Sequence, residues 1–199
     1  LTVTGFDATS QFGAGVTVNP DGTYSYDPTA AGYLQALAVG ETALDTFSYT
    51  IADLAGVEST STVTIEVTGV NDAPVITAGG DVAGTVDEDG QDAPTSVSGD
   101  LDSTDVDNGA TATWSVDGGG AGAYGDLSVD VNGTWTYDLR NGDANVQALA
   151  ATESHDELFT IVVTDEHGAT DTETVTVTVT GTNDDPVITA GGDVAGDVQ

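Results

Sequence analysis

The side chains of this sequence that are best equipped for chemistry are its carboxylates. Between residues 71 and 107 they recur at short spacing, together with one amide: Asn71, Asp72, Asp81, Asp87, Glu88, Asp89, Asp92, Asp100, Asp102, Asp105 and Asp107. Two carboxylates about 4 Å apart repel each other by several kcal/mol at a protein surface, so such clustering is unfavourable unless a cation intervenes. Hard oxygen ligands without Cys or paired His select Ca²⁺, and Mg²⁺ is the weaker choice.

That cation must come from solution. The chain has 34 Asp and Glu against one basic residue, Arg140, and its formal net charge is −33. Nucleic acids and acidic membrane surfaces are bound through clustered Lys and Arg, so the composition excludes both as partners. No apolar stretch approaches the ~20 residues of a membrane helix, so we expect no membrane insertion. The absence of Cys excludes disulfides, thiolate zinc sites and a Cys nucleophile.

The sequence repeats itself at an offset of 112 residues. Residues 69–84 recur as a near copy at 181–196, so that Asn71 returns as Asn183. This register predicts three parts: the later part of a first repeat at 1–70, a whole second repeat at 71–182, and a linker with the start of a third repeat at 183–199. A unit of this length, ~100 residues, is large enough to hold its own core. Because the sequence begins at Leu1 and shows no signal-peptide pattern, we expect a fragment of a longer tandem array.

Hydrophobic periodicity predicts strands. Residues 174–180 alternate strictly, with Val175, Val177 and Val179 on one face and threonines on the other, and residues 63–67 repeat the pattern. Turn signals separate such runs every 8 to 12 residues, among them the Asp-Gly and Asn-Gly pairs at 21–22 and 132–133. The sequence therefore predicts an all-β fold of tandem immunoglobulin-like antiparallel β-sandwich domains, with room for single helical turns near 34–37 and 146–150.

Three motifs occur together in each repeat. They are a Gly-x-Asn-Asp-x-Pro segment at 69–74 and 181–186, an Asp-x-x-Gly turn at 53–56 and 165–168, and an Asn/Asp-Gly-Thr-aromatic-x-Tyr hairpin at 21–26 and 132–137. In this combination the chain resembles the bacterial cadherin-like and VCBS-type tandem repeats of giant RTX adhesins and biofilm-associated surface proteins. The resemblance covers nearly the whole chain and implies cadherin-like β-sandwiches.

The resemblance also implies Ca²⁺ at each junction between repeats, bound by an early Glu, a mid-domain Glu, an Asn-Asp linker and an Asp-x-Asp turn of the following repeat. By this analogy one junction draws on Glu41, Asn71, Asp72, Asp105 and Asp107. The next junction draws on Glu88, Glu153, Asn183 and Asp184. The linker is shorter than in animal cadherins, which leaves the number of ions per junction open. Asp165 lies at a hairpin turn, and we expect it to close that turn rather than to bind an ion.

The resulting hypothesis is a structural extender of a secreted bacterial surface adhesin, outside the cell. Its neighbouring repeats are joined and rigidified through Ca²⁺, and the array supports cell adhesion and biofilm formation. We expect no enzyme: Ser154, His155 and Asp156 have the residue types of a catalytic triad, but three consecutive residues cannot adopt its geometry.

Three alternatives remain open at this stage. The acids could form a solvating coat that binds no specific ion. The sandwich could be a module that binds a surface glycan or a protein through its loops. Finally, the chain could self-associate as a filament subunit, in which the partial first repeat pairs with a tail such as 183–199 of a neighbour.

Overall fold

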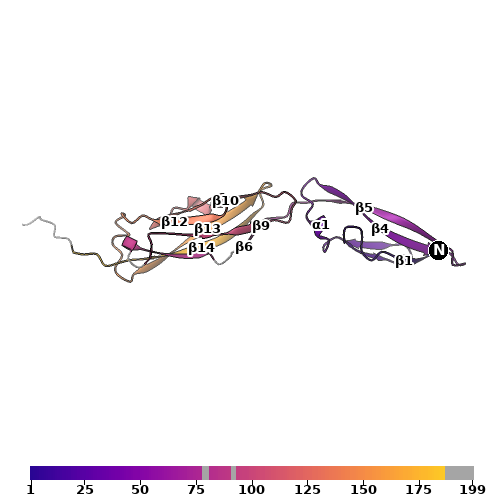
Figure 1. Ribbon diagram of the computed structural model, residues 1–199, viewed down its shortest axis with the longest axis horizontal. Coiled ribbons are helices and arrows are strands. Elements are labelled where there is room, and N and C mark those ends of the chain that lie inside the picture. The colour runs from indigo at the N-terminus through magenta and orange to yellow at the C-terminus, as the bar shows by residue number, and fades with distance from the viewer. Residues whose placement is uncertain (78–80, 91–92, 187–199) are drawn as a thin grey trace, which may run out of the picture. The chain divides into compact units, whose positions relative to one another are not determined.

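The computed structural model describes residues 1–77, 81–90 and 93–186 (Figure 1). Its contacts group into two compact units. Unit 1 comprises Leu1–Thr77, Ser103–Thr113 and Val162–Thr172, and unit 2 comprises Ala78–Asp102, Trp114–Ile161 and Glu173–Gln199. Most of the predicted third-repeat segment, residues 187–199, lies outside the described residues. Within the described ranges, no helix is long and apolar enough to cross a membrane.

The first repeat folds into strands joined by tight turns. Its elements are β1 (Thr2–Phe6), β2 (Gly15–Val18), β3 (Tyr24–Asp27), α1 (Gly32–Gln35), β4 (Thr42–Ala52) and β5 (Glu58–Thr68). In the described residues, one sheet has the order β1-β4-β5 and a second pairs β2 with β3, all antiparallel. The single helical turn expected near residue 34 is α1.

The second repeat contains the same series of strands as the first repeat, preceded by additional strands. Its elements are β6 (Val75–Thr77), β7 (Ala83–Asp87), η1 (Glu88–Gly90), β8 (Ser96–Asp100), β9 (Asp102–Thr104), β10 (Ala112–Val116), η2 (Asp117–Gly119), β11 (Gly125–Val129), β12 (Thr134–Leu139), β13 (Ser154–Asp165) and β14 (Thr170–Thr180). Its sheets have the orders β10-β13-β14-β7, β11-β12-β8 and β6-β9 within the described residues. The predicted all-β sandwich class is confirmed, with one parallel pair, β14 with β7, that the alternation could not reveal.

The hairpin turns follow from their residues. Gly22 and Gly133 have φ of +90° and +89°, the left-handed conformation that glycine adopts at least cost. In the β11–β12 turn, one carboxylate oxygen of Asp130 accepts the N–H groups of Asn132 at 2.7 Å and Thr134 at 3.1 Å. The carboxylate thereby takes the place of a backbone carbonyl in the turn. The same N–H donors hold the pKa of Asp130 below its usual value, although desolvation opposes this shift.

Trp135 forms the centre of the unit 2 core. The ring is 0% exposed and its Nε1 donates to the carbonyl of Asp81 at 2.7 Å. Gly84 of β7 and Gly99 of β8 make room for it, since a Cβ at Gly99 would lie 2.8 Å from the indole and a Cβ at Gly84 would lie 2.8 Å from Val97. Strands β7 and β8 therefore close the core over the tryptophan.

Each repeat buries one carboxylate beside a tyrosine, which the sequence analysis did not foresee. Asp45 is 0% exposed and accepts hydrogen bonds from Tyr26 Oη at 2.7 Å, Phe12 N–H at 3.0 Å and the Ser10 hydroxyl. Burial alone would raise the pKa of Asp45, but the donors from Ser10, Tyr26 and the backbone outweigh it and leave the pKa below its usual value.

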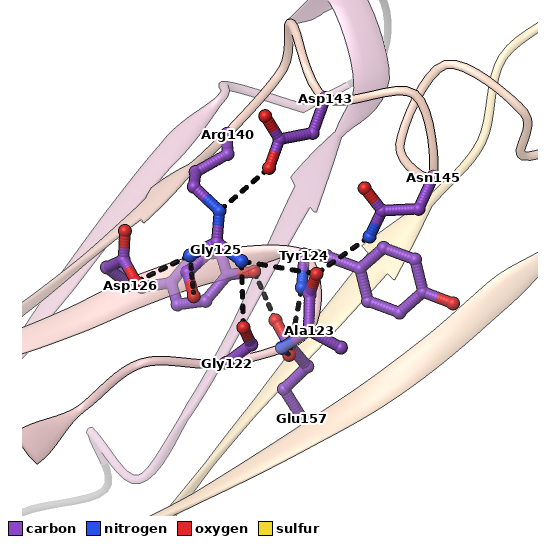
Figure 2. A network of polar contacts seen from close by, with 10 residues as sticks. Gly122, Ala123, Tyr124, Gly125, Asp126, Arg140, Asp143, Asn145 and Glu157 are labelled. Carbon is purple, nitrogen blue, oxygen red and sulfur yellow. Dashed lines mark hydrogen bonds and ion pairs between the residues drawn. The ribbon is translucent and has the colours of Figure 1, made fainter.

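The corresponding carboxylate of the second repeat, Glu157, accepts from the Tyr137 hydroxyl and from the N–H groups of Ala123 and Tyr124 (Figure 2). The same loop is held from the other side by Arg140, the one basic residue of the chain.

Arg140 is fully engaged in this network. Its guanidinium donates to the carbonyls of Gly122 at 2.8 Å and Gly125 at 3.1 Å, and pairs with Asp126 at 2.5 Å and Asp143 at 2.9 Å (Figure 2). The single arginine of the chain is therefore used to fix one loop, and its one positive charge is shared between two nearby acids.

We predict that Asp45→Ala lowers the free energy of unfolding by about 2–4 kcal/mol, because the buried Ser10 hydroxyl, the partly buried Tyr26 hydroxyl and the Phe12 N–H lose their acceptor. Denaturant unfolding followed by circular dichroism measures this change. The exposed surface variant Glu66→Ala is the control and should change the value by no more than about 0.5 kcal/mol.

The Asp45 contribution also depends on pH. Because its pKa is depressed in the fold, the stability difference between the wild type and Asp45→Asn should be complete above the unfolded-state value of about 3.9. It should then shrink as the pH falls through the lower folded-state pKa. A difference that grew on acidification would contradict this assignment.

Candidate metal centre

Three carboxylates of unit 2 converge at the end of β7. Ligand oxygens of Glu88, Asp89 and Asp184 all lie within 4.8 Å of one another, and we call these three residues the Glu88 cluster. Asp89 has a φ of +60° within η1, and this left-handed residue is positioned by Asn141, whose amide donates to its carboxylate at 2.8 Å and whose oxygen accepts its N–H at 3.0 Å. A cavity of about 640 Å³ borders the cluster.

Glu88 carries the strongest indication of a cation-binding site. Its side chain is 0% exposed, one carboxylate oxygen accepts the N–H of Thr182 at 3.1 Å, and the other, Oε1, has no hydrogen-bond partner among the described residues. A buried carboxylate oxygen without a donor costs free energy. The neighbouring carboxylates of Asp89 and Asp184 add like-charge repulsion, which solvent screens in part because both are exposed. A divalent cation bound to oxygen ligands would remove both costs.

A second group lies in unit 1. We call Asn71, Asp72, Asp105 and Asp107 the Asp107 cluster. Asp107 is 7% exposed, its Oδ2 accepts the N–H of Asp72 at 2.8 Å, and its own N–H donates to Asp105 Oδ1 at 2.9 Å. Its other oxygen, Oδ1, is buried and has no partner among the described residues. The Asp107 cluster therefore shares the unsatisfied carboxylate of the Glu88 cluster.

Glu41 is connected to the Asp107 cluster through Asn108, the residue that follows Asp107 in the sequence. Asn108 Nδ2 donates to Glu41 Oε2 at 3.1 Å, and the Asn108 N–H donates to the carbonyl of Ala36 at 2.9 Å. All three residues belong to unit 1. Hydrogen bonds therefore link the four members of the Asp107 cluster, and Glu41 is joined to them only through Asn108, the residue that follows Asp107. Among the described residues, the Glu88 cluster is the group whose carboxylates come within 4.8 Å of one another, and the acids of the first junction form no such group.

The ends of both repeats build the same local frame. Glu41 and Glu153 each accept the N–H of the residue three positions earlier at 3.1 Å. Asn71 Nδ2 donates to the carbonyl of Asp72 at 2.7 Å, and Asn183 Nδ2 donates to that of Asp184 at 3.1 Å. The repeated sequence therefore presents its Glu and Asn-Asp groups in a repeated geometry.

Asp165 combines two roles. Its Oδ1 accepts the N–H groups of His167 and Ala169, both at 2.8 Å, which closes the turn as predicted. Its Oδ2 accepts Asn71 Nδ2 at 2.8 Å. The Asn71 bond and the turn amides hold the pKa of Asp165 below its usual value, against the opposing effect of desolvation. The turn thus also positions the Asn71 side chain.

The structure separates the remaining expected ligands. Glu88 and Asp184 lie together, but Glu153 binds His155 at 3.0 Å and the Ala150 N–H, and lies outside the group within 4.8 Å. Asp89 and Asn108 are members that sequence reasoning missed. Both directly follow a predicted ligand in the sequence, which was the available signal.

Comparison with known proteins identifies the fold family. The family of bacterial cadherin-like domains matches residues 71–181, and the bacterial Ig domain family matches residues 1–66. The chain belongs to the bacterial cadherin-like domain family. A search of curated proteins found no match.

Solved cadherin structures resemble this bacterial cadherin-like chain at low identity. Drosophila N-cadherin EC1-4 is 16% identical, with a TM-score of 0.48 over 90% of this chain and 41% of that one. Mouse cadherin-23 EC22-24 is 18% identical, with a TM-score of 0.43 over 83% and 49%. Protocadherin gamma B7 extracellular cadherin domains 1-4 are 16% identical, with a TM-score of 0.46 over 90% and 42%. The chain spans less than half the length of these three proteins.

Family membership supplies the general context of both clusters. Cadherin-like domains generally bind Ca²⁺, and bacterial cadherin-like domains are typically extracellular surface domains of the adhesion type. The oxygen ligands that the Glu88 and Asp107 clusters offer fit that ion, as do the two buried carboxylate oxygens that lack a partner within the described ranges.

We predict that Glu88→Gln uncouples stability from calcium. In EDTA the variant should be as stable as the wild type or more stable, by up to about 3 kcal/mol, because the unpaired buried charge is gone. In millimolar CaCl₂ the wild type should gain more than the variant. Denaturant unfolding in both buffers measures this, with the exposed acid variant Asp117→Asn as control. Equal calcium-dependent gains in Glu88→Gln and wild type would exclude Glu88 as a ligand.

Proposed function

We propose that the chain is a non-catalytic extender segment of a bacterial surface adhesin, in which Ca²⁺ bound at the ends of the repeats fixes the geometry of successive domains. The observation that carries this proposal is the pair of buried carboxylate oxygens, on Glu88 and Asp107, that have no hydrogen-bond partner in the part of the chain that the structure describes. Each belongs to a group of oxygen ligands at a repeat end, in a chain with one basic residue.

The Asp107 cluster is the proposed site between the two repeats. Asn71 and Asp72 belong to the linker, Glu41 to the first repeat, and Asp105 and Asp107 to the second. Residues of both repeats would thereby bind one ion, with Asn108 and Asp165 positioning Glu41 and Asn71. Loss of the ion would leave the acids to repel one another.

The Glu88 cluster, with Asn183 directly before Asp184 in the sequence, is the proposed site at the other end of the second repeat. Extracellular modules commonly bind Ca²⁺ in the ~10⁻⁴ to 10⁻³ M range, so such sites are empty in the cytosol and filled outside the cell. Stiffening of the array would then accompany export. A stiffened array could project a distal adhesive domain and so support adhesion and biofilm formation.

We predict that Asp105→Ala with Asp107→Ala lowers calcium affinity at the Asp107 cluster by at least about tenfold while both repeats stay folded, since the ligands lie outside the two cores. Isothermal titration calorimetry measures the affinity, and circular dichroism checks the fold. The control is the double variant Asp100→Ala with Asp102→Ala, which removes two exposed carboxylates and so changes the net charge by the same amount. Unchanged affinity in Asp105→Ala with Asp107→Ala would refute the ligand assignment.

We predict a calcium-specific change in size. Small-angle X-ray scattering of the chain in EDTA, in millimolar CaCl₂ and in MgCl₂ at constant ionic strength should show a larger maximum dimension and a narrower conformational spread only with calcium. Identical profiles under the three conditions would mean that the acids form a solvating coat.

A further inference from the structure

Unit 2 contains a cavity that neither candidate metal site uses. It measures about 400 Å³ and lies where β10 ends beside the first half of β13. Its lining residues are 117–118, 120–124 and 155–160, none of which belongs to the Glu88 cluster or the Asp107 cluster. All of them lie within the segment that matches the bacterial cadherin-like family. The cavity is therefore a feature of the second repeat alone.

The loop that forms one wall of this cavity is fixed from two sides. Residues 118–120 are three successive glycines with φ of +71°, +84° and +78°, a conformation that other residues adopt at a cost. Glu157 accepts two backbone N–H groups of the loop, and Arg140 and Asn145 donate to three of its carbonyls (Figure 2). A wall held by so many bonds keeps its shape, and such preorganisation lowers the entropic cost of binding a ligand.

Carboxylates give the cavity a negative lining. Asp117 and Asp156 are exposed, and Glu157 is 8% exposed. The chain has no lysine, and its one arginine, Arg140, does not line the cavity. An anionic ligand would be repelled, so the lining admits a neutral or a cationic ligand. The formal net charge of −33 attracts cations to the whole chain and favours the cationic ligand.

Two further side chains narrow the choice of cation. The half-buried ring of Tyr124 stacks on that of His155, with 5.2 Å between ring centroids and 24° between planes. Leu158 is apolar and yet 68% exposed. An aromatic face attracts a cation, and an exposed aliphatic side chain packs against the methylene groups that carry it. A sugar would use the ring and the carboxylates, whereas a cation on an aliphatic stem also covers the leucine.

We propose that this cavity binds an arginine side chain of a partner protein. A guanidinium pairs with carboxylates through its planar fork, stacks on aromatic rings and is weakly hydrated, so it suits this lining better than an ammonium. It would lie against Tyr124 and pair with Asp117 or Asp156, with its methylene stem on Leu158. Arg140 of another copy does not fit this role, because its guanidinium is already engaged within its own repeat. The partner is therefore a different protein, and the contact goes beyond the proposed extender function.

Titration with a short peptide tests the ligand. Amide shifts of the ¹⁵N-labelled chain are followed by NMR as acetyl-Gly-Arg-Gly-amide is added in EDTA at constant NaCl. Saturable shifts should be confined to residues 117–124 and 155–160. The matched peptide with citrulline has the same shape but no charge and should bind at least about tenfold more weakly. Shifts that spread over the acidic surface without saturating, or equal affinity for the two peptides, would refute the proposal.

Variants of the lining test the residues. Tyr124→Leu should weaken binding of the arginine peptide about two- to fivefold, because it removes the ring and keeps the backbone N–H that Glu157 accepts. Tyr124→Phe keeps the ring and should bind like the wild type. Asp156→Asn should also weaken binding about two- to fivefold. Glu66→Gln makes the same charge change on the first repeat and is its control. Unchanged affinity in Tyr124→Leu or in Asp156→Asn, with the fold intact by NMR, would overturn the proposal.

Two further titrations separate arginine from other cations. Butylammonium has one charge and an aliphatic stem but no guanidinium, so it should bind these residues more weakly than the peptide. Equal or tighter binding would mean that the cavity takes any organic cation. The peptide affinity should be the same in millimolar CaCl₂ as in EDTA. Displacement of the peptide by CaCl₂ would assign these acids to the ion and overturn the proposal. None of these outcomes alters the assignments at Glu88 and Asp107, whose tests do not involve this cavity.

Discussion

The chain has 34 acidic residues and a single arginine, and the positions of the carboxylates reflect this shortage of positive charge. The side chain of Arg140 makes hydrogen bonds and an ion pair to one loop of unit 2. The other carboxylates must therefore find neutral donors. Turn acids such as Asp130 and Asp165 take backbone N–H groups, and the core acid Asp45 takes hydroxyls and an N–H. Among the described residues, Glu88 and Asp107 each keep one buried carboxylate oxygen without a hydrogen-bond donor, and both positions lie at repeat ends.

The way the carboxylates are paired with donors connects the fold to the candidate sites. The backbone of each repeat end is held by the same local bonds, in which the carbonyls of Glu41 and Glu153 accept the N–H groups of Gly69 and Gly181. A Cβ at Gly69 would collide with the backbone of Leu37 and Ala38, and a Cβ at Gly181 would collide with Leu149 and the carbonyl of Ala150, so close packing there requires glycine. The ligand-bearing segments are therefore positioned in part by the close packing of these glycines.

Much of the fold was readable from the sequence because its causes are local. Alternation such as Val175, Val177, Val179 identifies a half-buried strand, and the Asn-Gly and Asp-Gly pairs identify their turns. The parallel pairing of β7 with β14 was not readable, since it joins residues about 90 positions apart and leaves no periodic mark. The buried Asp45 and Glu157 were missed for a similar reason: their donors come from distant strands and loops. At the candidate sites, Glu88 and Asp184 were anticipated by resemblance, whereas Asp89 depends on a left-handed residue that sequence spacing does not reveal.

The parallel arrangement of β7 and β14 has a mechanical consequence. In a tandem array under tension, the pull enters a repeat ahead of β7 and leaves it after β14. Because the two strands run in the same direction, from Thr176 opposite Ala83 to Thr180 opposite Asp87, the pull slides one strand along the other. The hydrogen bonds of that ladder are then loaded together in shear, and do not open one after another as they would in a hairpin peeled from its end. The second repeat is thus built to resist stretching along the chain axis at the strand pair that also closes its core.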